Sequence, residues 1–156
     1  MGGVIAYILV SGDPGYDASV QHGLVAATSD QSSGIPWNNS GNTIFTGATA
    51  TAIGTGFANT NTIITSQGAT ATSYAAGLAR AHNGGGFTDW YLPSKNELDK
   101  LFDNRVAISG FASAFYWSST EFGNANNAWN QHFEFGNQYN FFNKSNTFSV
   151  RAVRSF

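Results

Sequence analysis

Hydrophobic residues form short runs at both ends of the chain, and the patterns between them are helical. The runs at residues 4–10 and 22–27 flank Ser11-Gly12-Asp13-Pro14-Gly15, a turn pattern, and so predict an early pair of strands. From Phe115 onward, short aromatic runs alternate with Gly-Asn turns at Gly123 and Gly136. This alternation predicts further strands at about residues 115–119, 128–133 and 148–153.

The middle of the chain carries three predicted helices. Asn59 or Thr60 is expected to cap the first, which carries Ile63 and Ile64, and Gly68 to close it, because Asn or Thr before a helix and Gly after it are boundary residues. The second is expected at about residues 71–82, ending at a run of three glycines.

The third predicted helix, at about residues 95–105, has the strongest local pattern. Ser94 and Glu97 have the spacing of a capping box, in which each side chain bonds the backbone N–H of the other residue. Leu98, Leu101 and Phe102 then recur at helical spacing. Helices in the middle and antiparallel strands at both ends predict an α+β fold in one domain over residues 1–156.

The composition narrows the class of partner. Charged residues make up 10% of the chain and aromatic residues 15%, with a net charge of −2 and no cluster of Lys or Arg. This argues against a nucleic-acid or membrane-surface binder. The apolar run at residues 4–10 is too short to cross a bilayer, so no membrane insertion is expected.

Candidate chemistry is sparse. The chain has no Cys, and His22, His82 and His132 are far apart without a metal-ligand spacing, so we expect no metal, no cofactor and no catalytic residues. Glu97 is accounted for by capping and Asp13 by its turn. Calcium-dependent lectins typically carry Glu-Pro-Asn or Gln-Pro-Asp, and the chain has neither.

Four ordered blocks of sequence together resemble the Lcl C-terminal domain family, named for a collagen-like bacterial adhesin. They are residues 21–27 (QHGLVAA), 85–98 (GGFTDWYLPSKNEL), 116–121 (YWSSTE) and 149–154 (SVRAVR), so the resemblance covers about residues 3–156. It implies a C-type-lectin-like fold with two helices and antiparallel strands at both ends. It also implies bacterial or phage adhesion at the cell surface or outside the cell, sometimes to sulfated polysaccharides and sometimes as a homo-trimer.

The tail at residues 116–156 also resembles the variable region of proteins that diversity-generating retroelements diversify, where randomised adenines turn Asn codons into many others. Half of the chain's asparagines lie in this tail, and certain residues among them are reachable from an Asn codon by adenine changes alone. Those residues are Phe122, Ala125, His132, Phe135, Tyr139, Phe141, Phe142 and Ser145. Trp129, Gln131, Glu134, Gln138 and Lys144 are not reachable and would be fixed. The alternative is that Asn simply suits turns and sheet edges.

Aromatic rings among Asn, Ser and Gly are typical of antibody paratopes, so the tail is predicted to bind a protein or glycan ligand on another cell. The predicted ligand-binding residues are Phe122, Asn124, Asn126, Asn127, Trp129, Asn130, His132, Tyr139, Asn140, Phe141, Phe142, Asn143 and Ser145. The alternatives are a polysaccharide-active or modifying enzyme, and a structural trimerisation cap.

Several side chains of the chain are instead expected to be structural. Trp90 and Trp117 are assigned to the core, and Phe133 and Phe135 are expected on one face of a strand with Trp129. Of the adjacent Phe141 and Phe142, one should be exposed. Arg151 and Arg154 could serve sulfated ligands, but the favoured prediction is that one of them pairs with a carboxylate, such as Glu97 or Glu121, and pins the terminal strand.

Overall fold

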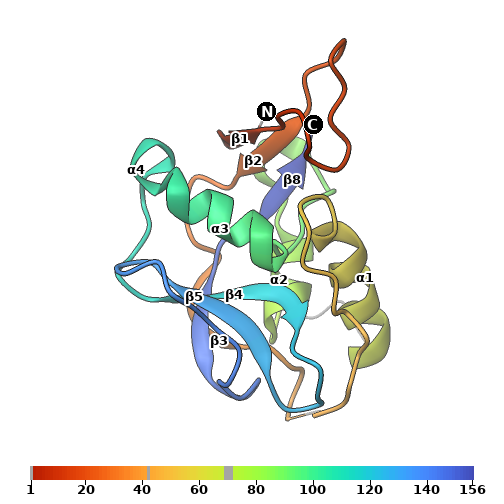
Figure 1. Ribbon diagram of the computed structural model, residues 1–156. Coiled ribbons are helices and arrows are strands. Elements are labelled where there is room, and N and C mark those ends of the chain that lie inside the picture. The colour runs from red at the N-terminus through yellow and green to blue at the C-terminus, as the bar shows by residue number, and fades with distance from the viewer. Residues whose placement is uncertain (1, 42, 69–71) are drawn as a thin grey trace.

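The two hydrophobic runs at the start of the chain form an antiparallel pair of strands in the computed structural model, which describes residues 2–41, 43–68 and 72–156. Strand β1 is Val4–Ile8 and β2 is Gly23–Ala26. The last strand, β8 (Val153–Ser155), pairs with the other edge of β2, giving a three-stranded sheet in the order β1-β2-β8. Both termini therefore lie at the same end of the molecule (Figure 1).

A second sheet has five strands in the order β3-β7-β4-β5-β6. Their bounds are β3 Ser32–Pro36, β4 Phe115–Glu121, β5 Ala128–His132, β6 Gln138–Tyr139 and β7 Thr147–Val150. Neighbours are antiparallel except β4 and β7, which are parallel.

The prediction of one strand over residues 148–153 is wrong. The chain leaves the second sheet after β7 and joins the first as β8. Between them, the Ala152 carbonyl accepts a hydrogen bond from the Ala27 N–H. The Arg151 side chain is buried and held by an ion pair to Asp30. This crossing links the two sheets, which no local pattern could reveal.

Helix α1 (Gly56–Gln67) starts earlier than predicted. Its N-cap is Thr55, because the predicted caps are buried and used elsewhere. The Asn59 amide donates to the Ala50 carbonyl at 2.7 Å, and the Thr60 hydroxyl bonds the backbone of Leu92. Gly68 closes the helix with a φ of 88°, as predicted.

The second predicted helix is shorter, since α2 spans Ala75–Ala81; its expected start at Ala71 lies outside the described residues. A 3-10 turn, η1 (Gly84–Gly86), follows. Helix α3 (Lys95–Asp103) has the predicted capping box in full, and a further turn, α4 (Arg105–Ile108), succeeds it. The described residues thus contain four α-helices, one more than the three that local patterns predict and two more than the family resemblance implies.

Strand β4 divides the core into two clusters. Tyr116 and Trp117 are adjacent and therefore point to opposite faces of the strand. Trp117 packs with Trp37, Trp90 and other residues beside α1 and α2, whereas Tyr116 packs in a second cluster beside α3. Trp90 and Trp117 are fully buried, as predicted.

The predicted α+β class is confirmed by the element order, with helices between strands at both ends. No helix in the described part of the chain has the length and apolarity needed to cross a bilayer.

Candidate ligand-binding surface

The tail is held in place by the side chains that adenine changes cannot produce. Gln131 is buried and its amide donates to Asp99 on α3 at 2.7 Å and to the Gly136 carbonyl at 3.0 Å. The Gln138 amide donates to the Lys95 carbonyl at 2.8 Å. These bonds fasten β5 and β6 to α3, so long polar side chains position the tail together with its buried rings, such as Trp117 and Phe133.

Lys144 fastens the following loop. Its ammonium group is fully buried, pairs with the Glu121 carboxylate at the end of β4, and lies 4.5 Å from the centre of the Trp37 ring. Glu121 also accepts hydrogen bonds from the backbone of Thr46 and Gly47. Both charges are thus compensated inside the protein, as buried ions require.

One continuous group of rings lies on the tail, and we call it the aromatic surface: Phe115, His132, Phe135, Tyr139, Phe141 and Phe142. Phe115 contacts His132, Tyr139 and Phe142 at ring-centroid distances of 4.5–5.8 Å. Phe135 stacks on His132, and Phe141 contacts Tyr139 and Phe142. Phe135 and Phe141 are 67% and 62% exposed, so large apolar area faces solvent here.

The predicted ligand-binding residues fall into three groups by exposure. Exposed are Phe122, Asn126, Phe141, Asn143 and Ser145. Half-buried are Asn124, Asn127, Trp129, His132, Tyr139, Asn140 and Phe142. Asn130 alone is buried, and its assignment to the surface is corrected: it pairs in register with Trp117 on β4 and with Tyr139 on β6, in the middle of the sheet.

Two further members of the aromatic surface were missed. Phe135 was expected on the same strand face as Phe133, but β5 ends at His132 and the chain turns, which buries Phe133 and exposes Phe135. Phe115 precedes the tail and is half-buried. Only the Gly136 turn could have indicated that alternation stops before Phe135. The prediction that one of Phe141 and Phe142 is exposed is confirmed by Phe141.

Some asparagines of the tail form turns, as the alternative explanation proposed. The side-chain oxygen Oδ1 of Asn124 accepts hydrogen bonds from the backbone N–H groups of Asn126 and Asn127 at 2.8 and 3.0 Å. The Asn143 side-chain oxygen accepts one from the backbone N–H of Ser145 at 2.9 Å. Asn126 and Asn143 are both exposed.

The prediction that Arg151 or Arg154 pairs with a carboxylate is confirmed for both, but their partners differ from the two named examples. Arg151 is buried and pairs with Asp30 at 2.7 Å, and Arg154 makes two bonds of 2.8 Å to Asp89. Hydrogen bonding to Arg154 lowers the pKa of Asp89. Glu97 and Glu121 were the wrong partners, because backbone N–H groups and Lys144 already satisfy them.

A family model for the Lcl C-terminal domain matches residues 26–154 of the chain. The chain belongs to the Lcl C-terminal domain family. Three of the four blocks that carry the resemblance lie inside the match, whereas residues 21–25 and the ends of the chain lie outside it. Membership points to a surface or adhesion-type domain. No curated protein is significantly similar to the chain.

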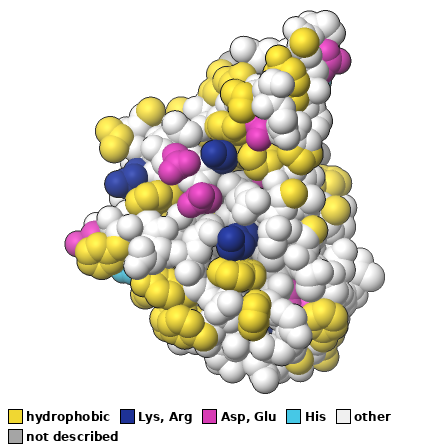
Figure 2. Space-filling view, viewed as in Figure 1, with side chains coloured by type: hydrophobic (Ala, Val, Ile, Leu, Met, Phe, Trp, Pro, Cys, Tyr) yellow, Lys and Arg dark blue, Asp and Glu magenta, His cyan; other side chains and the backbone are white. Residues whose placement is uncertain are grey.

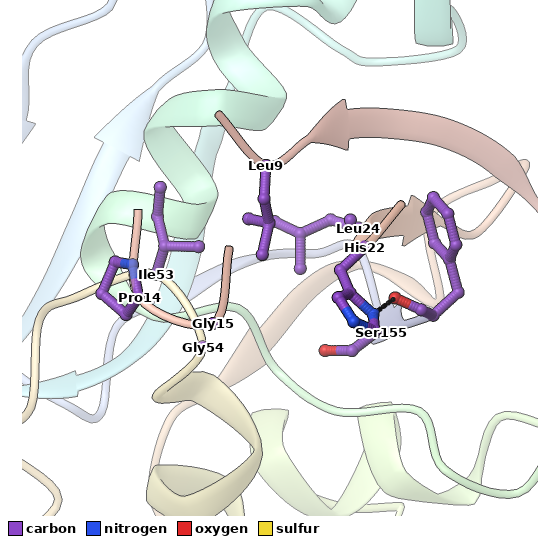
Figure 3. A pocket seen from close by; sticks show the side chains of 10 residues that line it. Leu9, Pro14, Gly15, His22, Leu24, Ile53, Gly54 and Ser155 are labelled. Carbon is purple, nitrogen blue, oxygen red and sulfur yellow. Dashed lines mark hydrogen bonds between the residues drawn. The ribbon is translucent and has the colours of Figure 1, made fainter. Parts of the chain in front are cut away.

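In this Lcl C-terminal domain, a small pocket lies beside the three-stranded sheet, between the segment after β1 and the C-terminus. Its volume is about 220 Å³, and Leu9, Leu24 and Ile53 line it with His22 and Ser155 (Figure 3). The His22 ring nitrogen Nδ1 bonds the Phe156 carbonyl at 3.3 Å (Figure 3). The histidine of this pocket therefore has a structural partner, the carbonyl of the last residue of the chain.

Glu97 is a buried carboxylate that bonds Gly54, one of the residues that line this pocket. It accepts N–H groups of Gly54 and Ser94 at 2.8 and 2.7 Å, and burial raises the pKa of its carboxyl. The Tyr91 hydroxyl links it to Ser155. Among the described residues, no group of three His, Asp or Glu side chains is placed to hold a metal ion.

Proposed function

We propose that the chain is a non-catalytic recognition domain of C-type-lectin-like fold, displayed outside the cell, that binds a protein or glycan on another cell through its tail. We further propose that a diversity-generating retroelement varies this tail. Assembly into a homo-trimer, which the family resemblance implies, belongs to the same proposal and is tested by light scattering.

The observation that carries the proposal is the division of roles within the tail. Of the asparagines and the interspersed residues named above for the tail, only Asn130 is buried, although Ala128 and Phe133, which adenine changes can also produce, belong to the core. Of the residues that such changes cannot produce, Gln131 and Lys144 are buried and Gln138 bonds α3, whereas Trp129 is half-buried and Glu134 is exposed. A fold that must tolerate variation needs this arrangement, because surface changes alter stability little and buried polar partners do not tolerate loss.

The topology supports the C-type-lectin-like part of the proposal. Strands β1 and β8, from the two ends of the chain, both pair with β2, and the long stretch between them builds the second sheet. A scaffold closed by its own termini can display a separate sheet and its loops. The structural partner of His22 and the absence of a metal-binding group among the described residues favour binding over the alternative of a polysaccharide-active enzyme.

Two matched libraries test the division of roles. The first randomises Asn124, Asn126, His132, Tyr139, Phe141 and Asn143 with codons that vary only the two adenines of an Asn codon. The second randomises Gln131, Gln138 and Lys144 with the same codons. We expect most displayed members of the first library, and few of the second, to resist protease. Equal loss in both would contradict the proposal.

The surrounding DNA tests the retroelement directly. We expect a near-identical repeat of the codons for residues 116–154 beside a reverse transcriptase gene, with mismatches confined to template adenines. A locus with neither feature would remove diversification from the proposal and leave the binding function standing.

A further inference from the structure

Every cation of the tail is already engaged within the protein. Lys144 and Arg151 are buried, with Glu121 and Asp30 as partners. Arg154 is held by both oxygens of Asp89. An anionic ligand that used one of these three cations would have to break its pair, and for Lys144 or Arg151 this would leave an uncompensated buried charge.

Cations from outside the tail do not supply the missing charge to the aromatic surface. Lys95 lies over Trp129 at 4.7 Å, Arg105 over Phe102 at 3.8 Å, and Lys100 pairs with Asp103. Within the described residues, no Lys or Arg stacks on a ring of the aromatic surface. On the face shown in Figure 2, charged side chains gather over α3, and hydrophobic ones lie below, over the five-stranded sheet.

The most exposed rings of the aromatic surface are phenylalanines, which offer no hydrogen bond. Phe135 covers His132 at an interplanar angle of 17°, and Phe141 tilts against Phe142 at 4.7 Å. A sugar can stack its C–H face on such rings, but phenyl rings offer its hydroxyl groups no hydrogen bond that would fix its orientation. Apolar side chains need no such hydrogen bond, and aromatic residues are enriched at the centres of protein interfaces.

We infer that the aromatic surface binds an uncharged, apolar patch of a protein, and not a sulfated polysaccharide. This inference rests on the proposed function, since it assigns a partner to the same tail. It makes binding depend little on ionic strength, because the rings are uncharged and salt screening acts only through Glu134, the exposed carboxylate next to Phe135 in the sequence.

The test uses three immobilised probes: heparin, the neutral polysaccharide laminarin, and peptides selected from a random phage-displayed library in 1 M NaCl. The whole domain is compared with the double variant Phe135→Ser/Phe141→Ser. The matched control is Val10→Ser/Val20→Ser, which removes two apolar side chains of 54% and 51% exposure from the loop between β1 and β2. Thermal melts establish that all three proteins are folded.

We expect selected peptides to bind the wild-type and control proteins and to lose at least about tenfold in affinity to the Phe135/Phe141 variant, about 1.4 kcal/mol. Affinity should change little between low salt and 1 M NaCl, and heparin and laminarin should retain no protein. If heparin or laminarin retains the wild-type protein but not the double variant, the inference is overturned and the proposed function stands. The same holds if no selected peptide loses affinity for the double variant. The proposed function would fall only with an equal loss of protease-resistant members in the two matched libraries described above.

Discussion

Aromatic residues serve opposite purposes in the core and on the tail. Trp37, Trp90 and Trp117 are fully buried, and each indole N–H donates to a backbone carbonyl, at 2.8, 3.2 and 2.9 Å. The most exposed rings of the aromatic surface, Phe135 and Phe141, have no polar group. Phe135 contacts the His132 ring, and Phe141 contacts the Phe142 ring.

The comparison teaches that hydrogen bonding, not ring content, separates the fixed region from the region open to change. A buried indole fills a large space and donates a hydrogen bond, so a replacement would have to match both its shape and its N–H group. An exposed phenyl ring has no partner to lose. In the tail, Gln131, Gln138 and Lys144 are the residues with fixed partners, because their polar groups bond Asp99, Lys95 and Glu121.

The largest effect is expected from the core tryptophans. Trp90→Ala and Trp117→Ala should each lower the free energy of unfolding by about 3–5 kcal/mol, because a large cavity and an unpaired carbonyl remain. Chemical denaturation measures the change. A loss below about 1 kcal/mol for either variant would show that this buried tryptophan stabilises the fold no more than a surface residue does.

The buried ion pair of the tail should come next. Lys144→Met keeps the volume of the side chain but leaves Glu121 charged and buried, so we expect a loss of about 3–5 kcal/mol. Lys100→Met, which removes a surface pair to Asp103, should cost at most about 0.5 kcal/mol. If the two variants unfold at the same denaturant concentration, Lys144 does not fix the tail.

The capping box offers a smaller, graded effect. Ser94→Ala should cost about 1 kcal/mol as the loss of one cap. Glu97→Ala should cost about 2–3 kcal/mol, because Glu97 is fully buried and its removal also strands the Gly54 and Ser94 N–H groups. Equal losses in denaturation experiments would show that Glu97 acts as a cap alone.

The smallest effect is expected on the aromatic surface. Tyr139→Ala and Phe141→Ala should each change the free energy of unfolding by less than about 1 kcal/mol, as is usual for surface positions. Thermal melts beside those of Trp90→Ala give the contrast. Were Tyr139 and Phe141 as costly as the tryptophans, the tail's rings would be core and the ligand-binding surface would lose its physical support.

Local sequence determined the elements whose cause lies within a few residues. The box of Ser94 and Glu97 starts α3, Gly68 ends α1, and the turn after β1 returns the chain as β2. The family blocks and the burial of Trp90 and Trp117 could also be predicted, because they depend on residue type and short-range pattern.

Only the tertiary structure decided which side chains meet. The partners Lys144 and Glu121 are 23 residues apart in sequence, and Arg151 and Asp30 are 121 apart. Asn130 is buried by its register between β4 and β6, and Phe135 is exposed because β5 ends before it. Residue type and spacing give a side chain's capacity to bond. Which partner satisfies it depends on how distant strands pair, and that pairing is decided by burial over the whole fold.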